Sequence, residues 1–192
     1  MKHGMMKKIG ALILAAAIGL SIPVNAQAAE NEYPYLYVHG QVSEDDFDAF
    51  TKKLDVLKDN CPGILDAFEE DSWMIILTSD DLDELVFRGN TEDVYGCTLV
   101  KKKVIFIEAG ENSGCIIHEM GHFLDSKSGM ISKKKDFKAI YKQEKKNISE
   151  YGQTSASEFF AEVFKESVLN EDSISESCPK AFEFIDELKT QF

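Results

Sequence analysis

The string HEMGH at residues 118–122 constrains the fold of this chain more than any other feature. In an α-helix, residues four apart lie on one face, so the imidazoles of His118 and His122 can reach the same metal ion. Glu119 is rotated by about 100° from His118 and therefore lies beside that ion. Apolar residues flank the string on both sides. The sequence thus predicts a partly buried helix over 115–125 with one face turned to a metal.

Zinc suits two neutral imidazoles, and a catalytic zinc takes three protein ligands while leaving one position open. Glu119 is placed to act as a general base toward a water molecule in that position. The alternative interpretation is two ordinary histidines on a surface helix. The rarity of histidine, with four in 192 residues, favours the metal site, and we expect one Zn²⁺ per chain.

The third ligand must come from elsewhere, because no further histidine follows at the spacing of the metzincins. The string SEFFAE at 157–162 places Glu158 and Glu162 one turn apart on an otherwise apolar helix. Burying two acids is costly without a cation, although both could instead face water. Spacing leaves the choice between them open. Cys115, one turn before His118, could complete a structural zinc site, which is the less favoured interpretation.

The remaining pattern predicts a single α+β domain. We expect an irregular entry over 30–37 and a helix break at 61–63. Strands are expected at 73–78, 98–100 and 104–108, and helices at 43–58, 134–146, 156–169 and 175–192, the last broken or kinked near Pro179.

Residues 1–28 have the pattern of a signal peptide, with a basic start, an apolar run and the small-x-small triplet Ala26-Gln27-Ala28. The apolar run of about 14 residues is shorter than the roughly 20 needed to span a bilayer, so a membrane anchor is the weaker alternative. We therefore expect Gram-positive-type export, a secreted, extracellular mature domain over 29–192, and no membrane contact after cleavage.

The net charge of −13 becomes −16 when the three lysines of residues 1–28 are removed, leaving 18 basic and 34 acidic residues. Such a surface argues against nucleic acid as a partner. The lysine-rich stretch 133–146 is interpreted as a solvated helix face, with a rim for an acidic partner as the alternative. Four cysteines allow either two disulfides or free thiols. We expect a monomer.

The string YGQTSASEFFAE at 151–162, together with HEMGH, resembles the catalytic domain of anthrax lethal factor and is similar to the secreted clostridial Pro-Pro endopeptidases. The resemblance runs from about residue 116 to the C-terminus. It implies a zincin-like fold, with a small mixed sheet in the N-terminal half and a mostly helical C-terminal half. It also implies that the chain is a zinc metalloendopeptidase.

The resemblance assigns a role to each matching position. It implies zinc ligation by His118, His122 and Glu158, base catalysis by Glu119 and stabilisation of the tetrahedral intermediate by Tyr151. It further implies that Glu162 supports the ligands from behind and that Asp125 orients a ligand imidazole.

A protein or peptide substrate is then expected to bind as an extended strand on a sheet edge near 98–108. Preference for proline near the scissile bond is a hypothesis, because residues 94–98 and 109–114 match the Pro-Pro enzymes poorly. The competing hypothesis is a catalytically inactive lethal-factor-like module that docks on a partner protein. The presence of all five catalytic and ligand positions favours the enzyme.

Overall fold

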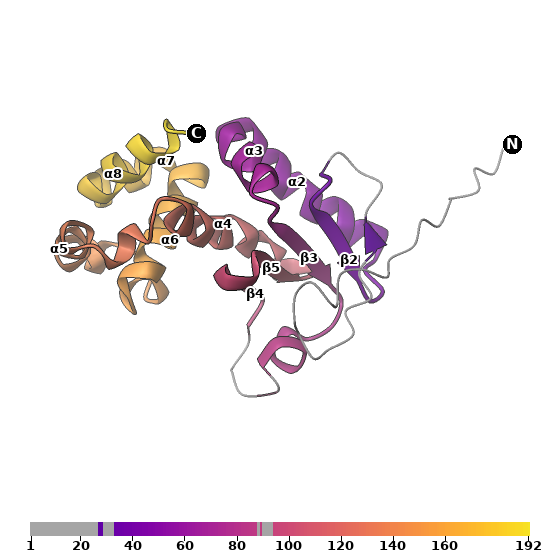
Figure 1. Ribbon diagram of the computed structural model, residues 1–192. Helices are drawn as coiled ribbons and strands as arrows, with labels where there is room; N and C mark the ends of the chain where they lie inside the picture. Colours follow the sequence, from indigo (N-terminus) through magenta and orange to yellow (C-terminus); the bar gives the residue numbers. More distant parts are fainter. Residues whose placement is uncertain (1–26, 29–32, 88, 90–93) are drawn as a thin grey trace, which may run out of the picture.

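The computed structural model describes residues 27–28, 33–87, 89 and 94–192 (Figure 1). The expected signal peptide therefore lies almost entirely outside the described residues. Among the described helices, none combines the length and the apolar character that crossing a bilayer requires.

A five-stranded mixed sheet lies in the N-terminal half, as predicted, with strand order β1-β2-β3-β5-β4. The three inner strands are parallel, and β1 and β4 pair antiparallel at the two edges. β4 is therefore the edge strand beside β5. The strands are β1 (Gln27–Ala28), β2 (Leu36–His39), β3 (Met74–Thr78), β4 (Gly96–Leu99) and β5 (Val104–Glu108).

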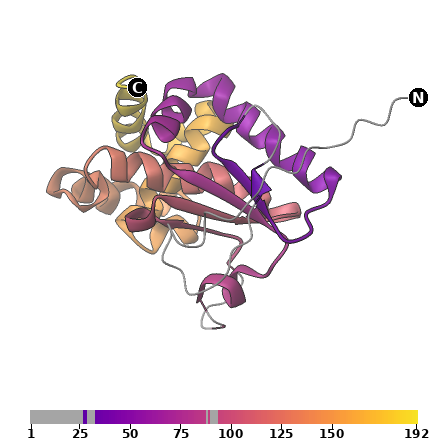
Figure 2. The same ribbon diagram turned by 45° about the vertical axis from the view of Figure 1, so that its right-hand side comes forward.

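Helices cover one face of this sheet and make up the C-terminal half of the domain (Figures 1 and 2). The opposite face carries a smaller apolar cluster built on Ile76, Leu82, Val104 and Phe106. The helices are α2 (Glu44–Asn60), α3 (Pro62–Glu70), α4 (Ile116–Lys127), α5 (Lys135–Glu144), α6 (Ala156–Leu169), α7 (Glu171–Ser177) and α8 (Pro179–Lys189).

Several elements differ from the sequence prediction. Strand β2 occupies the end of the segment that was expected to be irregular, and α3 starts where only a helix break was expected. Pro62 does end α2, but it also begins α3, because proline is well tolerated in the first turn of a helix, where its missing N–H costs nothing. The last predicted helix is broken before Pro179 into α7 and α8, as one of the two expected alternatives, but α7 begins earlier than predicted, at Glu171.

Short helical turns connect these elements. A turn at Val100–Lys102 joins β4 to β5 and ends with Lys103 in the left-handed region, at φ 53°. The others are the π-helical turn Asp83–Phe87 and the 3₁₀ turns Glu111–Cys115, Ile131–Lys133, Lys145–Asn147 and Tyr151–Gln153.

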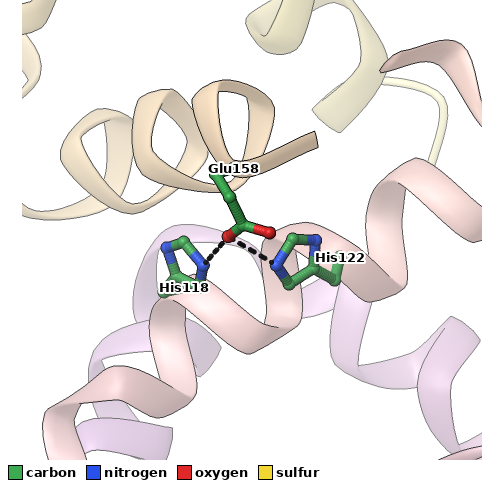
Figure 3. Close-up of side chains that lie close together, drawn as sticks. All are labelled: His118, His122 and Glu158. Carbon is green, nitrogen blue, oxygen red and sulfur yellow. Dashed lines mark hydrogen bonds and ion pairs between the residues drawn. The ribbon is translucent and has the colours of Figure 1, made fainter. Parts of the chain in front are cut away.

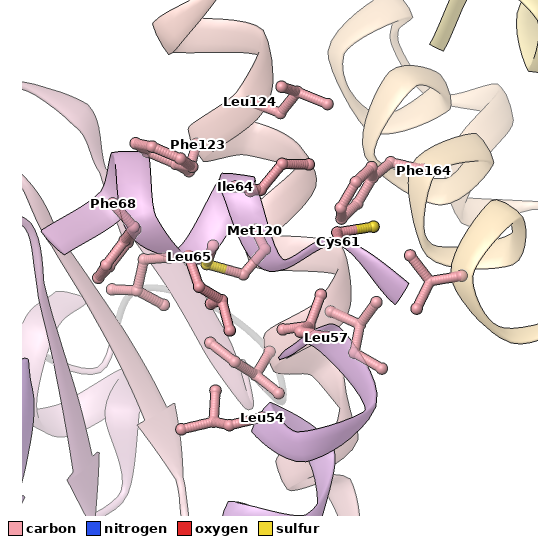
Figure 4. Packing of buried hydrophobic residues seen from close by; sticks show 14 of the residues in the cluster. Leu54, Leu57, Cys61, Ile64, Leu65, Phe68, Met120, Phe123, Leu124 and Phe164 are labelled. Carbon is pink, nitrogen blue, oxygen red and sulfur yellow. The ribbon is translucent and has the colours of Figure 1, made fainter. Parts of the chain in front are cut away.

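Helix α4 is central to the domain, with α6 packed against it on one side (Figure 3). Its other side meets the apolar faces of α2 and α3 (Figure 4). The packed side chains include Leu54, Leu57, Ile64, Leu65 and Phe68 from α2 and α3, Met120, Phe123 and Leu124 from α4, and Phe164 from α6. The motif helix is thus held on two sides, which fixes the positions of its functional side chains.

Candidate functional site

Three potential metal ligands converge between α4 and α6. His118 and His122 project from α4, and Glu158 projects from the first turn of α6 (Figure 3). One carboxylate oxygen, Oε2 of Glu158, lies 3.0 Å from Nε2 of His118 and 3.2 Å from Nε2 of His122. The three ligand atoms all lie within 4.8 Å of one another, so a single ion could contact all of them.

Two local features bring α6 into this position. Gly121 in α4 faces Ala161 of α6, and a Cβ at Gly121 would lie 2.7 Å from the Ala161 Cα atom. The missing side chain therefore allows the two helix backbones to approach closely. Ser155 caps α6, accepting a hydrogen bond from the backbone N–H of Glu158 at 3.1 Å. The cap fixes where the helix starts, and thereby places Glu158 opposite the histidines.

Glu162 lies one turn further along α6 and holds His118 from behind. Its Oε1 is 2.8 Å from Nδ1 of His118, and its Oε2 accepts a hydrogen bond from Ser149 at 2.7 Å. The ammonium of Lys165 lies 2.8 and 3.0 Å from the two oxygens. Burial alone would raise the pKa of Glu162, but these hydrogen bonds outweigh it and lower the pKa to about 2.

These contacts select a tautomer of His118. An ionised Glu162 can only accept hydrogen bonds, so Nδ1 of His118 must carry the proton that it donates to Glu162. When the ring is neutral, Nε2 then has no proton and presents its lone pair to Glu158. A lone pair facing a carboxylate at 3.0 Å requires a proton or a cation between them. Burial lowers the pKa of His118, yet its hydrogen bonds to Glu158 and Glu162 raise it to about 9. The donor set therefore fits a metal cation.

Glu119 is 6% exposed, and its carboxylate contacts the edge strand β4. The hydroxyl of Thr98 in β4 donates to its Oε2 at 2.6 Å. Gly96, two residues earlier in β4, lies directly over the same carboxylate, because a Cβ at that position would be 3.2 Å from Oε1 of Glu119. The carboxylate is therefore set against β4, next to the metal ligands and outside the set of three.

Tyr151 is 58% exposed, and its ring centroid lies 5.5 Å from that of His118. It begins the turn Tyr151–Gln153, which precedes α6. Partial burial and the nearby Glu158 carboxylate raise the pKa of the Tyr151 hydroxyl well above its usual range. The hydroxyl thus keeps its proton at neutral pH and can act as a hydrogen-bond donor.

Two cavities meet at this site. One, of about 360 Å³, is lined by His122 and Glu158 and by the β4 residues Cys97 and Thr98. The other, of about 630 Å³, extends past His118 toward Lys165 and Leu169. Both cavities are lined by Gly96, Glu119 and Tyr151. Open space on both sides of Glu119 and Tyr151 would accommodate a chain that continues in two directions.

One predicted role does not match the structure. Asp125 was expected to orient a ligand imidazole, but its two oxygens accept hydrogen bonds from the backbone N–H and the hydroxyl of Ser132, at 2.7 and 2.6 Å. Asp125 is 1% exposed and ties the segment after α4 back to that helix. The carboxylate that contacts a ligand imidazole from behind belongs to Glu162.

The cysteines are all free thiols, so the alternative of two disulfides is not what the structure has. Cys115 does not join the three-residue metal cluster and donates to the carbonyl oxygen of Tyr95 at 3.4 Å. Burial, followed by the charge of Glu119, raises the pKa of both Cys97 and Cys115 to about 12.

The structure adds residues to the site that sequence reasoning did not find. These are Thr98 beside Glu119, Ser149 and Lys165 beside Glu162, and Ser157, whose hydroxyl lies 3.4 Å from Nδ1 of His122. Lys165 and Ser157 carried a weak signal, since both lie within one turn of the paired glutamates. Thr98 and Ser149 carried no sequence signal, because only the tertiary fold brings them next to Glu119 and Glu162.

Comparison with known proteins finds relatives by structure and by sequence. The fold resembles that of the Pro-Pro endopeptidase of Paenibacillus alvei, with a TM-score of 0.66 and 20% identity, covering 80% of this chain and 97% of that one. Lethal factor of Bacillus anthracis is 31% identical over 94 residues, which is 42% of this chain. The chain spans only 12% of the length of lethal factor.

Residues 79–188 match the family described as anthrax toxin lethal factor, N- and C-terminal domain. The matched segment is more than half of the chain and contains α4, α6, the three candidate ligands, Glu119 and Tyr151. The chain therefore belongs to the anthrax toxin lethal factor family and has a zincin-like α+β fold.

Proposed function

We propose that this protein is a zinc metalloendopeptidase. The observation that carries the proposal is the convergence of His118, His122 and Glu158 on one point, with the buried carboxylate of Glu119 beside it. A ligand set of two histidines and one carboxylate, with a free carboxylate next to it, is typical of zinc peptidases. When bound, zinc would supply a Lewis acid that activates water and polarises the peptide carbonyl.

The other steps of peptide hydrolysis are carried out by side chains of this domain. Glu119 accepts the proton of the attacking water and later passes it to the amine that leaves. Tyr151 keeps its hydroxyl proton and donates it as a hydrogen bond to the oxygen that becomes negatively charged during attack. Glu162, supported by Ser149 and Lys165, holds His118 in the tautomer whose Nε2 lone pair is available.

The substrate is a protein or peptide bound as an extended strand against β4. This strand is an edge of the sheet, and no other strand of the described part of the chain pairs with its outer side, which suits strand addition. It runs alongside Glu119, and both cavities are lined by it. Preference for proline near the cut bond is the finer part of the proposal, suggested by the similarity to a Pro-Pro endopeptidase. Cleavage of a random peptide library should then enrich proline beside the scissile bond.

Export belongs to the same proposal. Residues 1–28 would direct secretion and be removed, leaving a monomeric extracellular domain. Expression in a Gram-positive host, followed by N-terminal sequencing of protein from the medium, should find a mature chain starting near residue 29. Full-length protein retained in the cells would contradict export.

Metal analysis and one substitution test the enzymatic proposal. The purified protein should contain about one zinc per chain. Glu119→Gln should retain that zinc and lose library cleavage by several orders of magnitude, because the proton acceptor is gone. Glu187→Gln, an exposed change on α8, is the matched control and should cleave as the wild type does. A zinc-loaded wild type that cleaves nothing would favour the alternative, an inactive module that docks on a partner.

A further inference from the structure

The geometry points to Thr98 as a positioning residue for the general base. We propose that its hydroxyl holds the Glu119 carboxylate in the orientation needed for proton transfer. This inference rests on the proposed peptidase function. Strand β4 would then both bind the substrate and position the general base. Thr98 is neither one of the three candidate metal ligands nor the base itself.

The contact is direct and directional. The Thr98 hydroxyl lies 2.6 Å from Oε2 of Glu119, whereas the Glu119 backbone oxygen is further away, at 3.2 Å. A hydroxyl has one proton to donate, and the shorter contact to a charged acceptor takes it. A 2.6 Å O–H···O⁻ bond is within the range of strong charge-assisted hydrogen bonds. Oε2 is thereby occupied.

The second oxygen is left available. Oε1 of Glu119 has no hydrogen-bond partner in the part of the chain that the structure describes, and it is not fully buried. Glu119 lines both cavities, so this oxygen can face a water molecule beside the ligands. The Thr98 bond therefore determines which of the two oxygens acts as the base.

The register of β4 explains why residue 98 can do this. Thr98 pairs with Ile105 and Gly96 with Ile107, two residues of the main core, on the sheet face that α4 covers. Alternation turns Cys97 to the opposite face. Gly96 leaves room for the carboxylate, and Thr98 supplies the donor. The two positions together hold Glu119 from the same strand.

Threonine suits this position better than serine. Its branched Cβ restricts χ1 in a strand, so the hydroxyl is held toward Glu119 with little loss of entropy. Valine has nearly the same shape and no donor. The pair Thr98→Val and Thr98→Ser therefore separates the hydrogen bond from packing.

The experiment measures kcat and KM of the zinc-loaded protein on one quenched fluorogenic peptide selected from the library. Thr98→Val should lower kcat by about 10- to 100-fold, the effect of a reacting group displaced by up to about 1 Å. KM and zinc content should stay near the wild-type values. Thr98→Ser should retain most of the activity. Thr51→Val, which removes a hydroxyl bonded to Asp48 on α2, is the matched control.

Three results would overturn the inference. An unchanged kcat in Thr98→Val would show that the bond has no role in the reaction. A change in KM alone would make Thr98 a substrate contact. Equal losses in Thr98→Ser and Thr98→Val would show that the hydroxyl is not the cause. If Thr98→Val fails to fold, Thr98→Ala carries the same expectation.

A wild type that cleaves no library peptide would defeat the proposed function and not, by itself, the placement of Glu119. A crystal structure of the zinc-loaded Thr98→Val protein tests independently of turnover whether Thr98 positions the Glu119 carboxylate. The Glu119 carboxylate should leave its wild-type position against β4. An unmoved carboxylate would contradict the positioning role even without any measurable turnover.

Discussion

Replacing Gly121 with alanine tests whether helix packing sets the geometry of the metal site. A Cβ at this position would lie 2.7 Å from Cα, 3.1 Å from the carbonyl oxygen and 3.2 Å from Cβ of Ala161. Ordinary contacts begin at 3.4 Å, so the closest pair must separate by about 0.7 Å. The obstructing atoms belong mainly to the α6 backbone, which cannot rotate away as a flexible side chain could.

Two effects on stability oppose one another. Overpacking of a filled core costs about 1–3 kcal/mol. Alanine is favoured over glycine inside a helix by about 1 kcal/mol. The free energy of unfolding should therefore fall by about 0–2 kcal/mol, which lowers Tm by at most roughly 8 °C for a domain of this size. The stability change alone is modest.

The effect on the metal site is larger than the effect on stability. The three ligands are divided between α4 and α6, so the displacement of α6 is transmitted to the distance between the histidines and Glu158. Metal–ligand distances tolerate only about 0.2 Å of change. A displacement of about 0.7 Å exceeds that tolerance, and zinc affinity should fall by about 10- to 100-fold, as when ligand orientation is disturbed.

Two assays separate these effects. Thermal unfolding followed by circular dichroism in EDTA gives the stability of the metal-free domain, and competition with a chromophoric chelator gives the zinc affinity. Gly114→Ala is the matched control, because its Cβ would meet only Lys53 Cε, at 3.9 Å. Wild-type zinc affinity in Gly121→Ala would refute the argument that close approach of α4 and α6 determines the site.

Three further predictions concern individual side chains. Glu162→Gln should weaken zinc binding by about 10- to 100-fold in the same chelator competition, because the charged partner of His118 is lost; unchanged affinity would contradict its supporting role. Tyr151→Phe should lower kcat by about 100-fold on the selected peptide while zinc content is retained, whereas loss of zinc would make the tyrosine structural. Because the pKa values of Cys97 and Cys115 are raised to about 12, their thiolates are scarce at pH 8 and iodoacetamide should react far more slowly than in urea, with rates rising toward pH 11; equal rates would be inconsistent with their burial.

Local sequence patterns predicted the structure correctly where a feature depends on a single helix. The four-residue spacing placed His118 and His122 on one face of a single helix, and the structure has them there. Helix α6 begins at Ala156 and ends at Leu169, as its apolar spacing predicted. These features depend on periodicity within the segment, which the sequence displays directly.

Residue spacing within one segment could not predict contacts between different helices and strands. Glu158 and Glu162 lie one turn apart and are equivalent in pattern, but α6 crosses α4 so that Glu158 meets both Nε2 atoms while Glu162 meets Nδ1 of His118. Asp125 illustrates the same limit. The family resemblance implied a histidine partner for it, yet the chain after α4 returns and supplies Ser132.

Charge provides a second argument that the site suits a divalent cation. Three carboxylates, of Glu119, Glu158 and Glu162, lie around the two histidines, and the ammonium of Lys165 pairs with one of them, Glu162. With both imidazoles neutral, this group carries a net charge of −2 in a largely buried setting, which is costly unless it is compensated. Without a metal, a proton on His118 would compensate part of that charge, because its hydrogen bonds to Glu158 and Glu162 raise the pKa of the imidazole. A bound divalent cation would compensate all of it and would replace that proton, because the ion and the proton compete for the same Nε2 lone pair.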